Sequence, residues 1–425
     1  MRDSVTRRPG RTLRIAGDRL LAAIRDLGAI GATADGGVTR LAFTDEDLRG
    51  RKLVHDLMVG AGLQTRIDSA ANIIGYRPGQ RQDLPVLMLG SHIDTVPNGG
   101  ALDGAYGVLA AVEVARALDE HGTLLSHPLA VVAFNNEEGA FGTRGMWGAH
   151  AMVGALDETD LAAADDRGRP VADLLTEMGG DPGRLDQAVW AADEVAAYFE
   201  LHIEQGPVLE SRNVRIGVVE AITGRSTLDV TVRGKASHAG TTPMELRQDA
   251  LVAAAQVILA VRDLAGRNGP VRVATVGSLS LAPNAWNVVP GIVTMQVDLR
   301  DVSESAMRQA AARLRGEILE IAMRTGTAID VAGQNSVPAV SCDLGLRDVI
   351  AAASESLNLS HLTLPSGAGH DAQVIGRIAP IGMIFVPSRG GISHAPEEHS
   401  AGDDLIAGAN VLLQSVLGYD ERYAN

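Results

Sequence analysis

Histidines and carboxylates recur along this sequence in short clusters. His92 and Asp94 lie two residues apart, Asp103 follows a little later, and Glu137 stands directly before Glu138. Imidazole and carboxylate ligands together suit Zn, Mn, Co or Ni. Of two adjacent glutamates, one can bind a metal ion while the other accepts a proton from the coordinated water. The Asp94 carboxylate could also accept the second N–H of the His92 imidazole and so fix its tautomer. These residues predict a hydrolytic metal centre.

Two further clusters come later in the chain. His202 is followed by Glu204, and His394 by Glu397. The sequence has one cysteine, Cys342, which excludes an internal disulfide, a thiolate zinc cage and an Fe–S cluster. One histidine of this kind is usually a structural residue, but several clusters at comparable positions favour a metal site.

Each cluster ends or follows a short, uninterrupted apolar run, which is typical of a strand buried on both faces. The predicted strands are Leu84–Leu89, Pro128–Phe134, Ala197–Ile203 and Pro380–Val386, with a helix from about Gly107 to Leu118. This pattern predicts an α/β domain with a mostly parallel sheet and helices on both faces. Because the carboxyl ends of such strands meet in one crevice, we expect the clusters to lie together there.

The segment from residue 223 to residue 337 has a different pattern. Leu228, Val230 and Val232 alternate with polar residues, as in a half-exposed strand. The expected element order is β-α-β-β-α-β, that of a ferredoxin-like α+β unit. The first predicted helix buries Leu251, Ala254, Ile258, Val261 and Leu264. We therefore predict that residues 1–222 and 338–425 form the larger domain and that residues 223–337 are inserted between its parts.

Charge and hydropathy limit the partners. The net charge of −15 argues against nucleic-acid binding and against binding to anionic membranes. No apolar stretch of about 18 residues is present, so we expect no membrane span. The N-terminus has no uninterrupted apolar run, so we expect no signal peptide and a cytoplasmic protein. The basic first dozen residues are interpreted as a frayed arm.

In this order, the clusters resemble the dinuclear metallopeptidase superfamily of aminoacylases and bacterial carboxypeptidases. Within it they resemble the branch of N-carbamoyl-L-amino acid hydrolases, allantoate amidohydrolases and β-ureidopropionases. The resemblance covers nearly the whole chain, and NGGALDG and LHIEQG point to this branch. The strings that carry it are GSHIDTVPNGGALDGAYGV (90–108), NNEEG (135–139), LHIEQGPVLE (201–210), GKASHAGTTPM (234–244), NVVPG (287–291), DLRD (298–301), SGAGHDA (366–372) and SHAPEE (393–398).

The resemblance implies two divalent metal ions per subunit, with Zn or Mn favoured over Co or Ni. Asp103 would bridge the two ions. His92 and His202 would complete one metal, and Glu138 and His394 would complete the other.

The resemblance also implies catalytic roles. Glu137 would be the general base and would later protonate the leaving amine, and Asp94 would be the partner of His92. The inserted domain would act as a lid and a dimerisation domain. It would carry His238 over the active site of the partner subunit to polarise the scissile carbonyl, which implies a homodimer.

Substrate contacts follow in the same way. Arg300 and Asn287 would bind the carboxylate of a small substrate, and Gln205 would lie near it. Gly369, in the turn 367–370, would line the same pocket. Independently, Arg300 ends the polar face of a predicted strand, and its guanidinium suits bidentate carboxylate binding.

The implied function is hydrolysis of the carbamoyl (ureido) C–N bond of an N-carbamoyl-L-amino acid or a related ureido acid. One alternative is an allantoate amidohydrolase, which would use the same residues. Another is an inactive protein that binds a ureido acid or a metal, which is expected to have lost a ligand or the base. An aminoacylase or dipeptidase fits LHIEQG less well.

Relatives usually have Arg-Phe shortly after EEG. Here Ala140 directly precedes Phe141, and Arg144 comes later, which leaves the shape of this loop and the substrate choice open.

Overall fold

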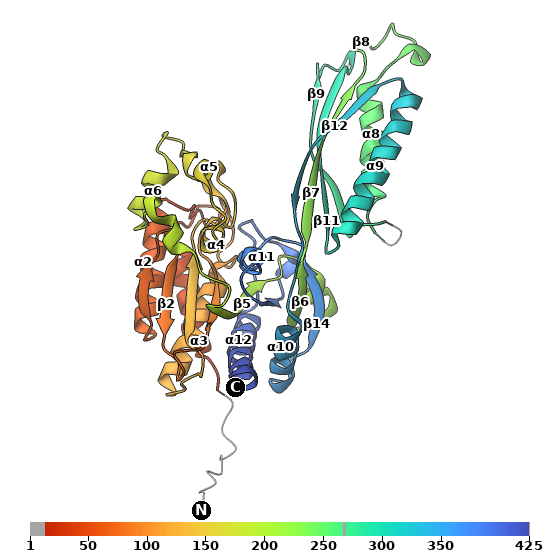
Figure 1. Ribbon diagram of the computed structural model, residues 1–425. Helices are drawn as coiled ribbons and strands as arrows, with labels where there is room; N and C mark the ends of the chain where they lie inside the picture. Colours follow the sequence, from red (N-terminus) through yellow and green to blue (C-terminus); the bar gives the residue numbers. More distant parts are fainter. Residues whose placement is uncertain (1–12, 267–268, 425) are drawn as a thin grey trace, which may run out of the picture. The chain divides into compact units, whose positions relative to one another are not determined.

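A computed structural model describes residues 13–266 and 269–424, so the predicted N-terminal frayed arm lies outside the described residues (Figure 1). The chain divides into two compact units. The first contains the described residues of Met1–Glu220 and Cys342–Asn425, and the second is Ala221–Ser341. No helix in the described ranges is long and apolar enough to cross a membrane.

The first unit is built on a sheet whose strand order is β1-β2-β4-β3-β5-β15-β6, with β14 also paired to β6. The pairs β4·β3, β3·β5 and β5·β15 are parallel, whereas β1·β2, β2·β4 and β15·β6 are antiparallel. The predicted mostly parallel centre is therefore confirmed. The strands are β1 (Gln64–Ile67), β2 (Ile73–Arg77), β3 (Val86–His92), β4 (Leu129–Phe134), β5 (Val195–Ile203), β6 (Ile216–Ile222), β14 (His361–Ser366) and β15 (Ile381–Val386).

Helices pack on this sheet. The α-helices of the first unit are α1 (Gly17–Gly28), α2 (Asp45–Gly60), α3 (Ala105–Glu120), α4 (Trp147–Met152), α5 (Glu158–Ala162), α6 (Val171–Glu177), α7 (Val208–Arg212), α10 (Leu344–Ser356), α11 (Asp371–Ile375) and α12 (Gly402–Tyr423). The largest apolar core lies between the central strands and helices that include α1, α3 and α12.

Side chains of the central strands alternate between this core and the opposite face of the sheet. On β5, Phe199 and Leu201 belong to the large core. The residues between and after them, Glu200 and His202, therefore project to the other face, where α4 and α11 pack. The first predicted strand extends further than expected, because β3 pairs with β4 as far as His92. His92 is thus the last residue of a strand and not part of the following turn.

The second unit has the predicted β-α-β-β-α-β order. Its four-stranded sheet has the order β12-β7-β11-β9 and is antiparallel throughout. Helices α8 and α9 contact each other and the sheet (Figure 1). A short pair, β8·β10, is added to this pattern, and β13 pairs with the end of β6. The elements are β7 (Gly224–Arg233), β8 (Ser237–His238), α8 (Ala250–Arg262), β9 (Val273–Ala282), β10 (Val288–Val289), β11 (Ile292–Asp301), α9 (Glu304–Thr325), β12 (Ala328–Val337) and β13 (Val340–Ser341).

The predicted buried face of α8 is partly wrong. Ala254, Val261 and Leu264 are buried as expected, and Ile258 is half-buried against the core. Leu251 is 37% exposed, however, and the fully buried Val257 was not predicted. Alanines at the buried positions let the helix approach its neighbours closely, so the larger side chains are turned outward. The predicted face is therefore right at most of its positions, but a pattern of long side chains placed Leu251 on it and missed Val257.

The single thiol provides a first prediction. Cys342 is buried, and burial raises the pKa of its thiol to about 12. Since the thiolate is the reactive form, we expect the native protein to react with a disulfide reagent at least about 1,000-fold more slowly than the unfolded chain. Titration with such a reagent, with and without denaturant, measures both rates. Rapid release of one equivalent from the native protein would contradict the buried position.

Candidate metal centre

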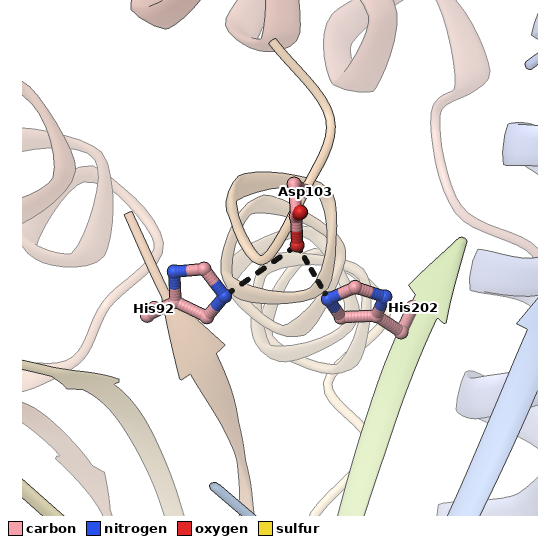
Figure 2. Close-up of side chains that lie close together, drawn as sticks. All are labelled: His92, Asp103 and His202. Atoms are coloured by element: carbon pink, nitrogen blue, oxygen red, sulfur yellow. Dashed lines mark ion pairs between the residues drawn. The ribbon is translucent and has the colours of Figure 1, made fainter. Parts of the chain in front are cut away.

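Two imidazoles converge on one carboxylate at the carboxyl ends of β3 and β5. Figure 2 shows Asp103 between His92 and His202. Asp103 Oδ1 lies 3.1 Å from His202 Nε2 and 3.7 Å from His92 Nε2. All three side chains are buried, and their ligand atoms are close enough together to hold one metal ion. We call these residues the first group.

Both imidazoles of the first group are fixed by backbone carbonyls. His92 Nδ1 donates to the carbonyl of Asp94 over 3.0 Å, and His202 Nδ1 donates to that of Ile203 over 2.8 Å. Each Nε2 is therefore left to face Asp103. The expected bond from His92 to the Asp94 carboxylate is not made, since Asp94 Oδ1 is 3.7 Å away.

The Asp94 carboxylate instead holds the two adjacent glutamates. Its two oxygens accept hydrogen bonds from the backbone N–H groups of Glu137 and Glu138, at 3.2 and 3.0 Å. Glu137 Oε2 lies 3.8 Å from His92 Nε2, beside the first group. The Asp94 side chain thus positions the glutamate loop. Its backbone carbonyl, and not its carboxylate, fixes the His92 tautomer.

A second group forms on the other oxygen of Asp103. His394 Nε2 lies 3.0 Å from Asp103 Oδ2 and 3.3 Å from Glu138 Oε1. These three residues could also hold a metal ion. The side chain of His394 is 49% exposed, and this residue has a positive φ of 56° in the loop after β15. The two oxygens of Asp103 therefore face two different ligand groups, which is the arrangement that a bridging carboxylate requires.

Charges in the two groups are strongly coupled. Burial acts to raise the pKa of Asp103, but the close imidazoles of His202 and His394, with that of His92, hold it well below its usual range. The carboxylates of Asp103 and Glu138 raise the pKa of His394 to about 10. Burial, followed by the negative charge of Asp371, raises the pKa of Glu137 well above its usual range. Negative charge thus surrounds the imidazoles, and the mixed His–carboxylate donor set fits a pair of divalent cations.

A glycine allows the first group to form. Gly104 has φ +60°, and a Cβ at this position would collide with the His92 ring. We expect Gly104→Ala to lose the metal ion of the first group, as measured by metal content after dialysis. Gly122→Ala is the matched control, because Gly122 also has φ +60° but has nothing near its Cβ position. Gly122→Ala should lower the free energy of unfolding by only about 1–2 kcal/mol, the cost of a left-handed backbone conformation for alanine. Equal metal loss in both variants would exclude the steric explanation.

The structure also places the other predicted residues of the first unit. Gln205 Nε2 donates to Asp103 Oδ2 over 2.8 Å, so Gln205 lies beside the second group. Gly369 lies beside Met146, whose Cε would be 3.0 Å from a Cβ at this position. The N–H of Met146 donates to the carbonyl of Glu137, so this turn lies near the glutamate loop. Both predicted positions therefore lie close to the ligand residues.

The predicted residues of the second unit do not lie together. Ala239, next to His238, donates its N–H to the carbonyl of Asn287, so His238 and Asn287 share one end of the unit. Arg300 pairs with Asp298 at the other end of β11. From Ile292 to Arg300 is eight residue steps, roughly 26 Å at about 3.3 Å per residue. One copy of this unit cannot bring Asn287 and Arg300 to the same small carboxylate.

A buried polar network was missed in the sequence. Glu200 accepts hydrogen bonds from Ser91 Oγ, Tyr198 Oη and the N–H of Ala372, at 2.8, 3.2 and 2.9 Å. Neither carboxylate oxygen of the fully buried Asp371 has a hydrogen-bond partner among the described residues. The available signal was Glu200 itself, a charged residue that shares one face of a buried strand with His202.

Arg144 takes a structural position. Its Nε donates to Asp160 Oδ1 over 2.6 Å, and its Nη1 donates to the carbonyl of Ala155. Phe141 has a positive φ of 56° in the same loop. Arg144 therefore links the loop after the glutamates to α5. At Phe141 the backbone of this loop is in the left-handed region.

Comparisons with known proteins agree with this arrangement. The family model Peptidase family M20/M25/M40 matches residues 88–417. An N-carbamoyl-L-amino acid amidohydrolase of Geobacillus stearothermophilus is 41% identical over 402 residues, covering 95% of this chain and 98% of that protein. An allantoate amidohydrolase of Bacillus subtilis is 35% identical over 387 residues, covering 91% and 93%. The crystal structure of an amidase of the hydantoinase/carbamoylase family from Burkholderia multivorans has a TM-score of 0.90 at 36% identity, covering 96% and 98%. The chain belongs to Peptidase family M20/M25/M40.

Proposed function

We propose that this protein is a metal-dependent amidohydrolase that cleaves the carbamoyl C–N bond of N-carbamoyl-L-amino acids. The observation that carries the proposal is Asp103, whose two oxygens face two groups of metal-ligand residues next to Glu137. The similarity to N-carbamoyl-L-amino acid amidohydrolases over nearly the full length supports the substrate class.

We assign a pair of divalent cations, Zn or Mn, to the two groups. His92 and His202 would hold one ion, Glu138 and His394 would hold the other, and Asp103 would serve both. When bound, the ions supply Lewis acidity to water and to the scissile carbonyl. The lone buried cysteine fits a reducing compartment such as the cytoplasm.

Glu137 moves the proton. Its carboxylate takes a proton from the attacking water and delivers it to the nitrogen that leaves as the amino acid. His238 donates to the developing oxyanion on the carbamoyl group, where a fixed positive dipole is most effective. Arg300, Asn287 and Gln205 hold the substrate, with the guanidinium on its carboxylate. A ureido substrate then yields ammonia and carbon dioxide in addition to the amino acid.

We further propose that the active protein is a homodimer in which the second unit supplies dimer contacts. His238 and Asn287 lie at one end of β11 and Arg300 at the other, so a complete site needs the two ends from different copies. The edge strand β9 supports self-association. It has no charged residue, no proline and no buried residue among its ten, and an unprotected edge of this kind is rarely left open in a monomer.

Allantoate is the alternative substrate. Allantoate amidohydrolases are also similar over most of the chain, and the same catalytic residues serve both reactions. An inactive binding protein is disfavoured, because both ligand groups and Glu137 are present and lie together.

An assay of the metal-replete enzyme tests this function. Ammonia release is measured with several N-carbamoyl-L-amino acids, their D-enantiomers, N-carbamoyl-β-alanine and allantoate. N-acetyl amino acids are scored by amine release. We expect the highest kcat/KM with an N-carbamoyl-L-amino acid. Higher kcat/KM with allantoate would select the alternative, and turnover of N-acetyl amino acids alone would refute carbamoyl specificity.

A further inference from the structure

The two ligand groups differ in how their members are held. His92 and His202 stand on neighbouring parallel strands, and their side chains are only 3% and 1% exposed. His394 instead lies in a loop with left-handed residues at Gly390 and Gly391, and its side chain is 49% exposed. The first group is therefore fixed by the sheet, whereas the second needs another element to keep His394 next to Asp103.

The carboxylate of Glu398 provides this connection. Glu398 Oε1 accepts hydrogen bonds from the backbone N–H groups of Leu102 and Asp103, at 2.9 and 3.1 Å. Glu398 Oε2 accepts a hydrogen bond from Ser393 Oγ over 2.7 Å. Ser393 directly precedes His394, so the two oxygens of Glu398 join the loop of the bridging aspartate to the loop of the exposed imidazole.

The residues around the Glu398 carboxylate leave space for it and extend its hydrogen-bond network. A Cβ at Gly100 would collide with the Glu398 carboxylate, so this glycine lets the side chain reach the main chain of the Asp103 loop. Ser393 Oγ also lies 3.2 Å from Asp103 Oδ2 and 3.2 Å from Gln205 Nε2. Ser393 therefore connects Glu398 to Asp103 Oδ2, the oxygen that faces the second group.

We infer that Glu398 is a positioning residue that acts mainly on the metal affinity of the second group, by holding His394 and Asp103 at ligand distance. This inference rests on the proposed two-metal function. Hydrogen-bond partners of metal ligands commonly change metal affinity by about 10- to 100-fold when they are removed. Since the first group has no contact with Glu398 except through Asp103, its affinity is expected to change much less.

The test is a titration of metal-free protein with Co²⁺, followed by calorimetry and by visible absorption. We expect the wild type to bind two equivalents. In Glu398→Ala, the first equivalent should bind nearly as in the wild type, and the second about 10- to 100-fold more weakly. Glu397→Ala is the matched control, because Glu397 is the exposed neighbour. It should bind both equivalents as the wild type does.

Two further variants separate positioning from a general loss of structure. Ser393→Ala removes the Oε2 contact, together with the longer contacts of Ser393 Oγ to Asp103 and Gln205. Glu398 keeps its two hydrogen bonds to the Asp103 loop in this variant, so the second equivalent should be weakened less than in Glu398→Ala. Glu398→Gln should restore most of the affinity, because its amide oxygen can accept from the Asp103 loop while its nitrogen donates to Ser393 Oγ. If Glu398→Ala does not unfold cooperatively, Ser393→Ala and Glu398→Gln decide the question.

The outcomes distinguish the inference from the proposed function. Wild-type affinity for the second equivalent in Glu398→Ala and Ser393→Ala would overturn the inference while leaving the two-metal site intact. Equal weakening of both equivalents would also overturn it, because a site-specific role would be absent. A wild-type protein that binds fewer than two equivalents would refute the two-metal function itself.

Discussion

Replacing Glu137 by Gln is expected to lower kcat by about 10²- to 10⁴-fold, the range for removal of a general acid–base group. The upper part of this range is expected, because in the proposed mechanism the same carboxylate both accepts the proton and returns it to the leaving nitrogen. The Asp94 carboxylate binds the backbone N–H of residue 137, so the amide side chain should be held in the same place. Steady-state kinetics with an N-carbamoyl-L-amino acid measures the change.

The control for Glu137→Gln is its metal content. None of the three residues of either ligand group is altered, so two equivalents should remain bound. Activity within tenfold of the wild type would refute the proton-transfer role. Loss of activity accompanied by loss of metal would instead place Glu137 among the ligands.

Mixing inactive variants is expected to restore activity in a pattern that reports which copy supplies each residue. His238→Ala alone should lose about 10²- to 10³-fold in kcat, as for removal of an oxyanion donor. Mixed with Glu137→Gln under conditions of subunit exchange, it should recover about a quarter of wild-type activity. Half of random pairs are mixed, and each mixed dimer contains one intact site.

The same experiment distinguishes the two ends of β11. His238→Ala and Arg300→Ala should complement each other, since the two residues lie at opposite ends of the strand and in the proposed dimer would reach a site from different copies. His238→Ala and Asn287→Ala share one end and should not complement. Recovery in the second mixture, or failure in the first, would contradict a shared site of this geometry.

The positions of the candidate ligands were predictable because of the way a parallel sheet orders its strand ends. His92 ends β3 and His202 lies near the end of β5, so two imidazoles distant in sequence had to meet at one edge. Asp103 follows in the loop before α3, where a glycine with positive φ lets the chain pass close to His92. The sequence pattern also predicted the element order of the second unit.

Hydrogen bonds between loops were not predictable in the same way. Asp94 was expected to bind an imidazole through its carboxylate, but its side chain holds the glutamate loop and its main chain holds the imidazole. Glu398 lies in a string in which the sequence pattern singled out His394 and Glu397 but gave no role to Glu398. Residue type and spacing predict which strand ends meet, but they do not specify the partner of each oxygen.

The buried acidic residues around this sheet are expected to affect the lifetime of the protein as well. Asp94, Asp103, Glu200 and Asp371 are all buried, and the two oxygens of Asp371 have no donor among the described residues. Mutual repulsion of buried carboxylates favours any ligand that brings positive charge, and a cation that binds only the folded state stabilises it by mass action. In a cell starved of divalent ions, the chain would open more often and be degraded sooner by proteases. Its abundance would then follow the supply of its cofactor.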